Sequence, residues 1–231
     1  MAAAQEMGYA DCMDLARADG DAGFDAAVAW EGLGGGLPAR HCQALALITL
    51  GHYGDAGLRL EAIAKEPGVR SETVVSLLAQ AGQAWLLADR PDRALEVQIA
   101  ALDLAPEDAE LRVDRAQSHA ALKDPAAALQ DLNAALDAGL ENAQVMTLRA
   151  AALRQVGRLE DAHTSVEAAL AMTLDYPPAL LERGLIAAQK GDKEAARKNW
   201  LHLLSRVPEE APEAAAARGH LERMDVTGAK P

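Results

Sequence analysis

The sequence contains few aromatic residues, and this shortage restricts the fold. Only 3% of the 231 residues are aromatic, whereas 50% are hydrophobic and alanine is the commonest residue type. Strands favour aromatic and β-branched side chains, while alanine has the highest helix propensity, so this composition suits closely packed helices. The predicted fold class is therefore all-α.

Positive charge and long apolar runs are also scarce. The chain has 22 Lys and Arg residues against 35 Asp and Glu residues, which gives a net charge of −13. A surface field of this sign repels phosphate groups, so neither nucleic-acid binding nor attachment to an anionic membrane surface is expected. No run of about 18 apolar residues occurs, and the sequence therefore predicts no membrane insertion.

The sequence patterns that accompany catalysis or metal binding are missing. There is no HExxH, no CxxC and no pair of carboxylates at a catalytic spacing. Gly34, Gly35 and Gly36 form a glycine triplet that lacks the lysine of a phosphate-binding loop, so a flexible turn is expected. Ser118 and His119 are neighbours in the chain but point to different faces of a helix, which separates nucleophile from base. We therefore expect no catalytic residues, no cofactor and no resident metal.

The chain has only two cysteines, Cys12 and Cys42, which stand 30 residues apart near the N-terminus. This spacing is slightly less than one 34-residue repeat of the chain, described below, and would place the two residues on adjacent helices at bridging distance. A disulfide is the favoured interpretation. Two buried free thiols are one alternative, and a soft-metal site that includes Met13 and His41 is another, because thiolate and thioether ligands suit Cu(I).

The first residues and the cysteine pair together favour an exported protein. The chain opens with Met1 followed by three alanines, which is similar to a start placed just after a signal-peptidase site. Disulfides persist in oxidising compartments. The expected location is the periplasm or cell envelope after removal of a signal peptide, with the cytoplasm as the alternative.

From Val75 onward the sequence repeats every 34 residues without an insertion. The eighth position of each repeat is small and the twentieth is alanine, which allows two helices to approach closely. These residues are Gly82, Ala116, Ala150 and Gly184 at the eighth position, and Ala94, Ala128, Ala162 and Ala196 at the twentieth. Apolar residues recur at helical spacing in two stretches of each repeat, with a turn between them. Each repeat is therefore predicted to be a helical hairpin.

The same columns extend upstream and define the predicted organisation of the chain. Residues 1–36 are expected to form a degenerate N-terminal helical hairpin and a glycine-rich loop. The five repeats are 37–70, 75–108, 109–142, 143–176 and 177–210. The insertion 71–74 is predicted to add a turn to the next helix, with Ser71 as its N-cap. A capping helix is expected at 211–224 and a frayed tail at 225–231.

These columns resemble the tetratricopeptide repeat family, whose repeats are 34 residues long with small residues at the eighth and twentieth positions and often proline at the thirty-second. Pro106 and Pro208 stand at that last position. The resemblance covers about residues 37–210. It implies a bacterial protein with a right-handed superhelical solenoid of antiparallel helical hairpins, in which the first helices line a concave groove. The sequence departs from the family early in the first helix, where large residues such as Trp are usual and Leu78, Arg112, Met146 and Leu180 stand instead.

The resemblance also implies which residues face the groove, because the second, fifth, ninth, twelfth and thirteenth positions do so in the family. The candidate partner-binding residues are Ala79, Gln83, Leu86, Leu87, Val113, Gln117, Thr147, Ala151, Arg154, Leu181, Leu185 and Gln189. Family members that clamp a terminal carboxylate carry Lys, Arg and Asn there, whereas only Arg154 is positive here. The expected groove is neutral and partly apolar.

The resemblance therefore predicts a non-enzymatic scaffold that holds a peptide or partner protein in this groove. The run from Ala196 to Met224 is similar to the ends of periplasmic repeat proteins in cytochrome maturation, which suggests a role in envelope protein assembly. A carrier of a small apolar ligand or lipid is the first alternative, and an enclosed cavity would favour it over an open trough. Soft-metal handling at Cys12 and Cys42 is the second.

Overall fold

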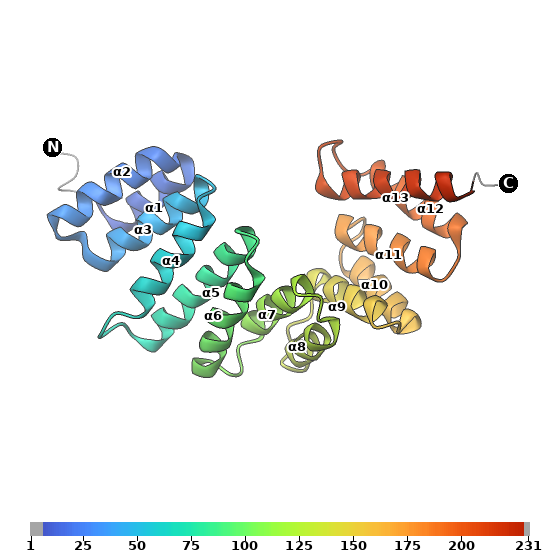
Figure 1. Cartoon of the computed structure of the whole chain (residues 1–231), viewed down its shortest axis with the longest axis horizontal. Coiled ribbons are helices and arrows are strands. Elements are labelled where there is room, and N and C mark those ends of the chain that lie inside the picture. The colour runs from blue at the N-terminus through green and yellow to red at the C-terminus, as the bar shows by residue number, and fades with distance from the viewer. Residues whose placement is uncertain (1–6, 229–231) are drawn as a thin grey trace. The chain divides into compact units, whose positions relative to one another are not determined.

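The computed structural model describes residues 7–228, and these residues form helices and no strand (Figure 1). The chain divides into two compact units, the N-terminal unit Met1–Leu122 and the C-terminal unit Lys123–Pro231. The described part of the N-terminal unit comprises α1 (Tyr9–Ala18), α2 (Gly20–Trp30), the π-helical segment η2 (Glu31–Gly35), α3 (Gly36–Thr49), α4 (Tyr53–Ala64), α5 (Ser71–Leu87), α6 (Pro91–Leu104) and α7 (Ala109–Ala121). That of the C-terminal unit comprises α8 (Pro125–Asp137), α9 (Ala143–Gln155), α10 (Leu159–Met172), α11 (Pro177–Gln189), α12 (Lys193–Leu204) and α13 (Pro212–Gly228).

Consecutive helices pack against each other as antiparallel hairpins within each unit. In the N-terminal unit α5 lies against α4, α6 and α7, and in the C-terminal unit α9 lies against α8, α10 and α11. First helices of neighbouring repeats therefore touch directly, as α5 and α7 do and as α9 and α11 do. This arrangement leaves one face of each unit formed mainly by first helices.

The turn between the two helices of every repeat has the same backbone conformation. The fifteenth residue of each repeat has a positive φ, and these residues are Gly51 (77°), Asp89 (56°), Lys123 (62°), Gly157 (82°) and Gly191 (85°). Glycine adopts this left-handed conformation without the steric penalty that a Cβ atom brings. The shared φ places the turn where the sequence periodicity predicted it.

Helix capping follows the same period. Asp108 and Asn142 stand at the last position of their repeats, and their side chains accept hydrogen bonds from the first backbone N–H groups of α7 and α9. Asp124 and Asp192 stand at the sixteenth position and cap α8 and α12 in the same way. Each such cap satisfies backbone donors that have no partner inside the helix.

Close helix packing at the eighth and twentieth positions confirms the reason given for their small residues. Ala94, Ala128, Ala162 and Ala196 are all buried. A Cβ atom on Gly184 would lie 2.2 Å from Nε1 of Trp200 on the opposite helix of the hairpin. Only a residue without a side chain fits at that position unless the indole moves.

Of three local expectations, two were wrong. Ser71 is the first residue of α5 rather than its N-cap, which is Arg70, although the insertion does lengthen the helix by about a turn. The glycine triplet does form the expected turn, because Gly34 and Gly36 both have a positive φ and kink the chain between η2 and α3. The final helix continues past Met224 through Gly228, so the predicted tail is helical as far as the described residues reach.

Candidate binding trough of the N-terminal unit

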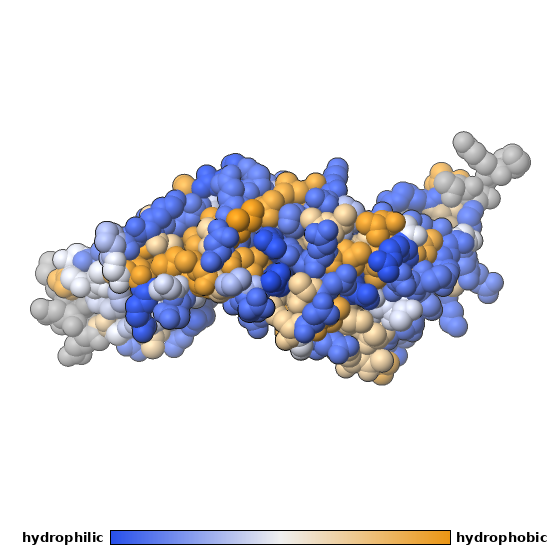
Figure 2. Space-filling view, turned by 90° about the horizontal axis from the view of Figure 1, so that it is seen from below, coloured by the Kyte–Doolittle hydropathy of each residue, from blue (hydrophilic) through white to orange (hydrophobic). Residues whose placement is uncertain are grey.

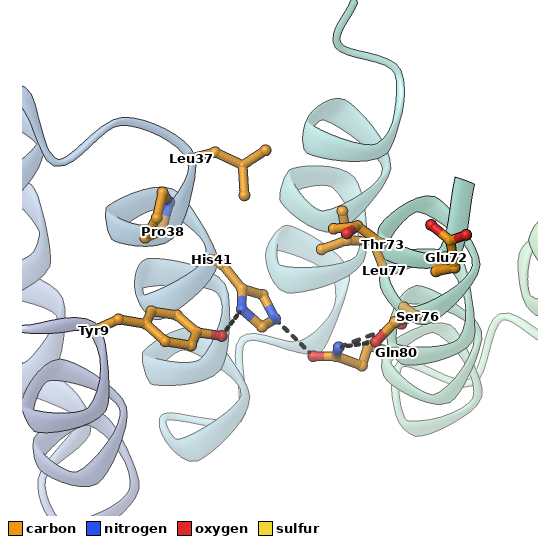
Figure 3. A pocket seen from close by; sticks show the side chains of 9 residues that line it. All are labelled: Tyr9, Leu37, Pro38, His41, Glu72, Thr73, Ser76, Leu77 and Gln80. Carbon is orange, nitrogen blue, oxygen red and sulfur yellow. Dashed lines mark hydrogen bonds between the residues drawn. The ribbon is translucent and has the colours of Figure 1, made fainter. Parts of the chain in front are cut away.

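A cavity of about 310 Å³, here called cavity A, lies between α3 and α5 in the N-terminal unit (Figure 3). Its apolar lining comes from Leu37 and Pro38 on α3 and from Leu77 on α5, while Tyr9 contributes from α1. Figure 3 shows Leu37 and Pro38 facing the side chains of α5 across the cavity. The cavity therefore has an apolar wall on α3, while the α5 wall combines Leu77 with polar side chains.

A chain of hydrogen bonds crosses one edge of cavity A from α1 to α5 (Figure 3). Oη of Tyr9 lies 2.5 Å from Nδ1 of His41, whose Nε2 lies 2.8 Å from Oε1 of Gln80. Nε2 of Gln80 in turn donates to the backbone oxygen and Oγ of Ser76, both at 3.3 Å. A neutral imidazole with its proton on Nε2 satisfies every bond in this chain, with Tyr9 as the donor to Nδ1. Partial burial raises the pKa of the Tyr9 hydroxyl, so it keeps the proton that it donates.

A second cavity of about 560 Å³, here called cavity B, lies on the adjoining face of α5, between α5 and α7. Glu72 and Ser76 line both cavities, so the two are adjacent. The remaining lining residues of cavity B come from α5, from α7 and from the end of α6 with the turn after it: Ser71, Val75, Ala79, Gln83, Leu104, Ala105, Asp108, Glu110, Leu111 and Asp114. Cavities A and B together form the surface that we call the N-terminal trough.

Four carboxylates line cavity B, namely Glu72, Asp108, Glu110 and Asp114. Burial raises the pKa of Asp114 to about 6, and a hydrogen bond from Gln83 offsets only part of that effect. The negative charges of Glu110 and Asp108 raise it further. Cavity B is thus a strongly acidic environment, and the expectation of a neutral groove is wrong for this unit.

The predicted groove residues of the N-terminal unit are only partly where the resemblance placed them. Ala79 and Gln83 line cavity B. Leu87 is exposed, whereas Leu86 packs against the core. Gln117 is half-buried on α7. Val113 is 6% exposed, so its side chain faces the protein interior and cannot receive a ligand as predicted.

In the C-terminal unit the predicted groove residues lie on α9 and α11. Ala151, Leu181 and Leu185 are half-buried, and Gln189 is exposed. Nε2 of Gln189 donates to the backbone oxygen of Arg154 at 3.4 Å. Thr147 was misplaced, because it is buried and its Oγ1 donates to the backbone oxygen of Ala143 at 2.7 Å.

Arg154 does not supply free positive charge to a groove, as the sequence suggested. Its Nε lies 2.5 Å from Oε1 of Glu182, whose side chain is only 7% exposed. Burial raises the pKa of Glu182, and the guanidinium of Arg154 opposes that shift. The arginine therefore balances a buried carboxylate of the neighbouring repeat.

Cys12 and Cys42 form the predicted disulfide, which joins α1 to α3. Both residues are buried in a small apolar cluster with Met13 and Ala16. With both sulfurs in the bridge neither can act as a thiolate ligand, so the soft-metal alternative applies only to a reduced protein. Within residues 7–228, no group of three or more His, Cys, Asp or Glu side chains is placed to hold a metal ion.

Ser118 has a structural role. It is completely buried, and its Oγ donates to Oε1 of Gln98 at 2.6 Å.

Hydrophobic residues are interspersed with hydrophilic ones on the face of the molecule shown in Figure 2. Among the described helices, none has both the length and the apolar character needed to cross a membrane.

The stacked hairpins, with a common turn position and small residues at the helix crossings, define an α-helical repeat protein. No model of a protein family matches the chain, and no curated protein matches its sequence. Similar solved structures include MamA of Desulfovibrio magneticus RS-1, with a TM-score of 0.63, 18% identity and coverage of 73% of this chain and 93% of that one. A thermophilic TPR protein of Thermus thermophilus also has a TM-score of 0.63 at 18% identity, covering 80% of this chain and 98% of its own. The chain thus has the tetratricopeptide repeat fold.

Proposed function

We propose that the protein is a non-enzymatic binding scaffold that holds an extended segment of a partner protein along the N-terminal trough. The observation that carries this proposal is the adjacency of cavities A and B on two faces of α5. A folded partner with a flat surface would fill neither cavity, whereas an extended segment presents a side chain to each in turn. The tetratricopeptide fold supports the same class of function.

A carrier of a small apolar molecule is the less favoured function. Apolar ligands are usually enclosed by apolar side chains. Glu72, Ser76, Gln83 and Glu110 are exposed at the trough, so its cavities open to solvent and are bordered by charge. Burying an apolar molecule there would remove water from carboxylates without replacing its hydrogen bonds.

Site-specific photo-crosslinking in an extract of the native host tests the scaffold function. A photoreactive amino acid replaces Ser76 or Gln83 in the trough, and the matched control replaces Ala100, which is exposed on the second helix α6. We expect discrete adducts of the same partner from both trough positions and none from Ala100. Equal crosslinking from Ala100, or no adduct from either trough position, would contradict the proposal.

We also propose that the protein works in the periplasm or cell envelope, where it assists the assembly of envelope proteins. The Cys12–Cys42 disulfide supports this location, because cytosolic thiols are normally kept reduced. The test is fractionation of native cells with rapid thiol alkylation. The expected result is unalkylated, bridged protein in the envelope or periplasmic fraction. Alkylated protein in the cytosolic fraction would overturn the proposed location.

A further inference from the structure

Cavities A and B differ in chemistry although they share the α5 ridge. Leu37, Pro38 and Leu77 give cavity A an apolar surface beside its polar α5 side chains. The four carboxylates of the trough gather in cavity B, of which only Glu72 also borders cavity A. A single ligand that occupies both cavities must therefore present an apolar group to one and a cation to the other.

The carboxylates of cavity B differ from Glu61 and Glu182, two buried carboxylates that have cationic partners. Glu61 lies 2.9 Å from Nη2 of Arg93, and Glu182 pairs with Arg154. Among residues 7–228, by contrast, the ion pairs include no lysine or arginine bound to any of the four carboxylates of cavity B. Asp108 and Asp114 are half-buried, whereas Glu72 and Glu110 are exposed. An acidic cluster of this kind without a lysine or arginine partner is complementary to a cation supplied by a ligand.

The arrangement of the carboxylates favours a side-chain cation over a bound metal ion. Glu72 stands on α5, Asp108 precedes α7, and Glu110 and Asp114 lie one turn apart on α7. No three of them meet as a metal-ligand group within the described residues. A Lys or Arg side chain is long enough to enter the cavity of about 560 Å³ and reach these oxygens from the trough.

The distance between the cavities sets a spacing in the ligand. They lie on adjoining faces of one helix, and the helix diameter of roughly 10 Å with side chains sets the scale of the distance between their centres. An extended peptide advances about 3.3 Å per residue, so roughly three residues separate groups that enter the two cavities. An extended segment in the polyproline II conformation has three residues per turn, so side chains three residues apart point to the same side and can both enter the trough.

We propose that the N-terminal trough recognises an extended segment in which an apolar side chain fills cavity A and a Lys or Arg about three residues away enters cavity B. This inference rests on the proposed function, since it names the class of segment that the scaffold would hold. The backbone of the segment passes over Glu72 and Ser76, which line both cavities. Either chain direction satisfies the two cavities, so the order of the two anchors is an outcome of the test.

Selection from a phage library of random dodecapeptides on the oxidised full-length protein tests this pattern. We expect enriched peptides to carry an apolar residue and a Lys or Arg separated by about three positions. Their synthetic, fluorescein-labelled forms are then titrated by anisotropy. Enriched peptides that bind but lack a cationic residue, or that show no fixed spacing, would overturn the inference.

Matched variants assign the anchors to their cavities. The double variant Glu110→Gln/Asp114→Asn should weaken a selected peptide about tenfold, as expected for the loss of charge-assisted contacts. Asp103→Asn, on the exposed side of α6, removes one charge outside the trough and should change affinity less than about twofold. Thr73→Phe fills cavity A and should weaken peptides with the apolar anchor while leaving their lysine-only analogues unchanged. Thermal unfolding followed by circular dichroism confirms that each variant is folded.

Two outcomes separate the failure of this inference from the failure of the scaffold function. If peptides protect Ser76 from crosslinking yet bind the carboxylate variants as tightly as wild type, the scaffold function stands and the proposed apolar and cationic ligand pattern is overturned. If peptides neither protect Ser76 nor respond to any trough variant, both the trough as the binding site and the proposed ligand pattern are overturned. Equal competition by spermine would also overturn the assignment, because cavity B would then bind amines without an extended segment.

Discussion

At the scale of single residues, the fifteenth position of each repeat is constrained by its left-handed backbone conformation. Gly51, Gly157 and Gly191 adopt the left-handed conformation there without a Cβ atom, but Asp89 and Lys123 adopt it with one. Aspartate tolerates this region better than most residues do, and lysine has no such advantage. Lys123 therefore holds an unfavourable backbone conformation for its residue type.

Replacing Lys123 should make this strain measurable. Lys123→Gly should raise the free energy of unfolding by about 1 kcal/mol, because the left-handed conformation then carries no steric penalty. Gly157→Ala is the reciprocal variant and should lower it by about 1 kcal/mol. Urea unfolding followed by circular dichroism measures both. A destabilised Lys123→Gly variant would show that contacts of the lysine side chain outweigh the backbone term.

Asp114 predicts a pH-dependent stability. Its pKa rises from an ordinary value of 3.8 to about 6 on folding, so the folded state holds the proton more tightly. The stabilisation that this proton brings is fully present below about pH 4 and is lost as the pH rises through about 6. Asp114→Asn should thus be more stable than wild type at pH 8 by about 1–2 kcal/mol, after an allowance for solvent screening, and equal to it below about pH 4.

Chemical unfolding of Asp114→Asn and Asp103→Asn across this pH range tests the prediction. Asp103 is exposed on α6, so its variant should follow the wild-type pH profile. A constant difference between Asp114→Asn and wild type at every pH would mean that the carboxyl titrates normally.

At the scale of helices, the sequence predicted the hairpins well because each repeat had to satisfy two independent periods. Apolar residues at helical spacing located the helices, and small residues every 34 positions located their crossings. The beginning of α5 was harder, since Ser71 is a good N-cap by residue type while Arg70 occupies the cap. Residue preference alone could not distinguish two adjacent starts.

Gly184 and Gly219 form a matched pair for testing helix packing in the C-terminal unit. A Cβ on Gly184 would overlap the indole of Trp200, whereas one on Gly219 would lie 3.4 Å from the flexible guanidinium of Arg223. Gly184→Ala should lower the free energy of unfolding by about 1–3 kcal/mol through overpacking. Gly219→Ala should raise it by about 0.5–1 kcal/mol, because alanine is the better helix former. Equal effects of the two variants in thermal unfolding would contradict this account of the hairpin.

The ion pair between Arg154 and Glu182 links two neighbouring repeats, and its loss should be asymmetric. Arg154→Met leaves a buried carboxylate without its partner and should lower the free energy of unfolding by about 3 kcal/mol. The double variant Arg154→Met/Glu182→Gln removes both charges and should recover most of that loss. A double variant as unstable as Arg154→Met alone would show that packing of the arginine stem, rather than charge, is what matters.

At the scale of the whole molecule, the fold was predictable and the candidate site was only partly so. The concave columns led to Ala79 and Gln83, which do line cavity B. Glu72, Asp108 and Asp114 were missed because they come from an insertion, an interhelix turn and a sixth position that the family pattern does not mark. Glu110 stands at the second position, which the family pattern does mark, but it was not among the candidate groove residues. The net charge of −13 gave no indication of which acidic side chains lack a cationic partner.

Loss of the disulfide should destabilise only the helices near it. The bridge closes a loop of 30 residues between α1 and α3. In the chain-entropy model its removal by Cys12→Ser/Cys42→Ser costs roughly 3–4 kcal/mol. Repeat proteins are stabilised mainly by neighbouring contacts, so amide exchange should accelerate in α1–α3 and remain unchanged in α9–α12. Faster exchange throughout both units would indicate a single cooperative body instead.

Asp114 also connects ligand binding to the buffer in which it is measured. Near pH 6 this carboxyl is about half protonated, and a cation placed beside it would lower its pKa. Each binding event would then release a fraction of a proton, and protonation of the buffer adds its own enthalpy to the measured heat. Calorimetric titrations in phosphate and in imidazole at the same pH should give different apparent enthalpies, and Asp114→Asn should abolish the part of that difference that this carboxyl contributes. The slope against buffer ionisation enthalpy would count the protons that the trough releases when it is filled.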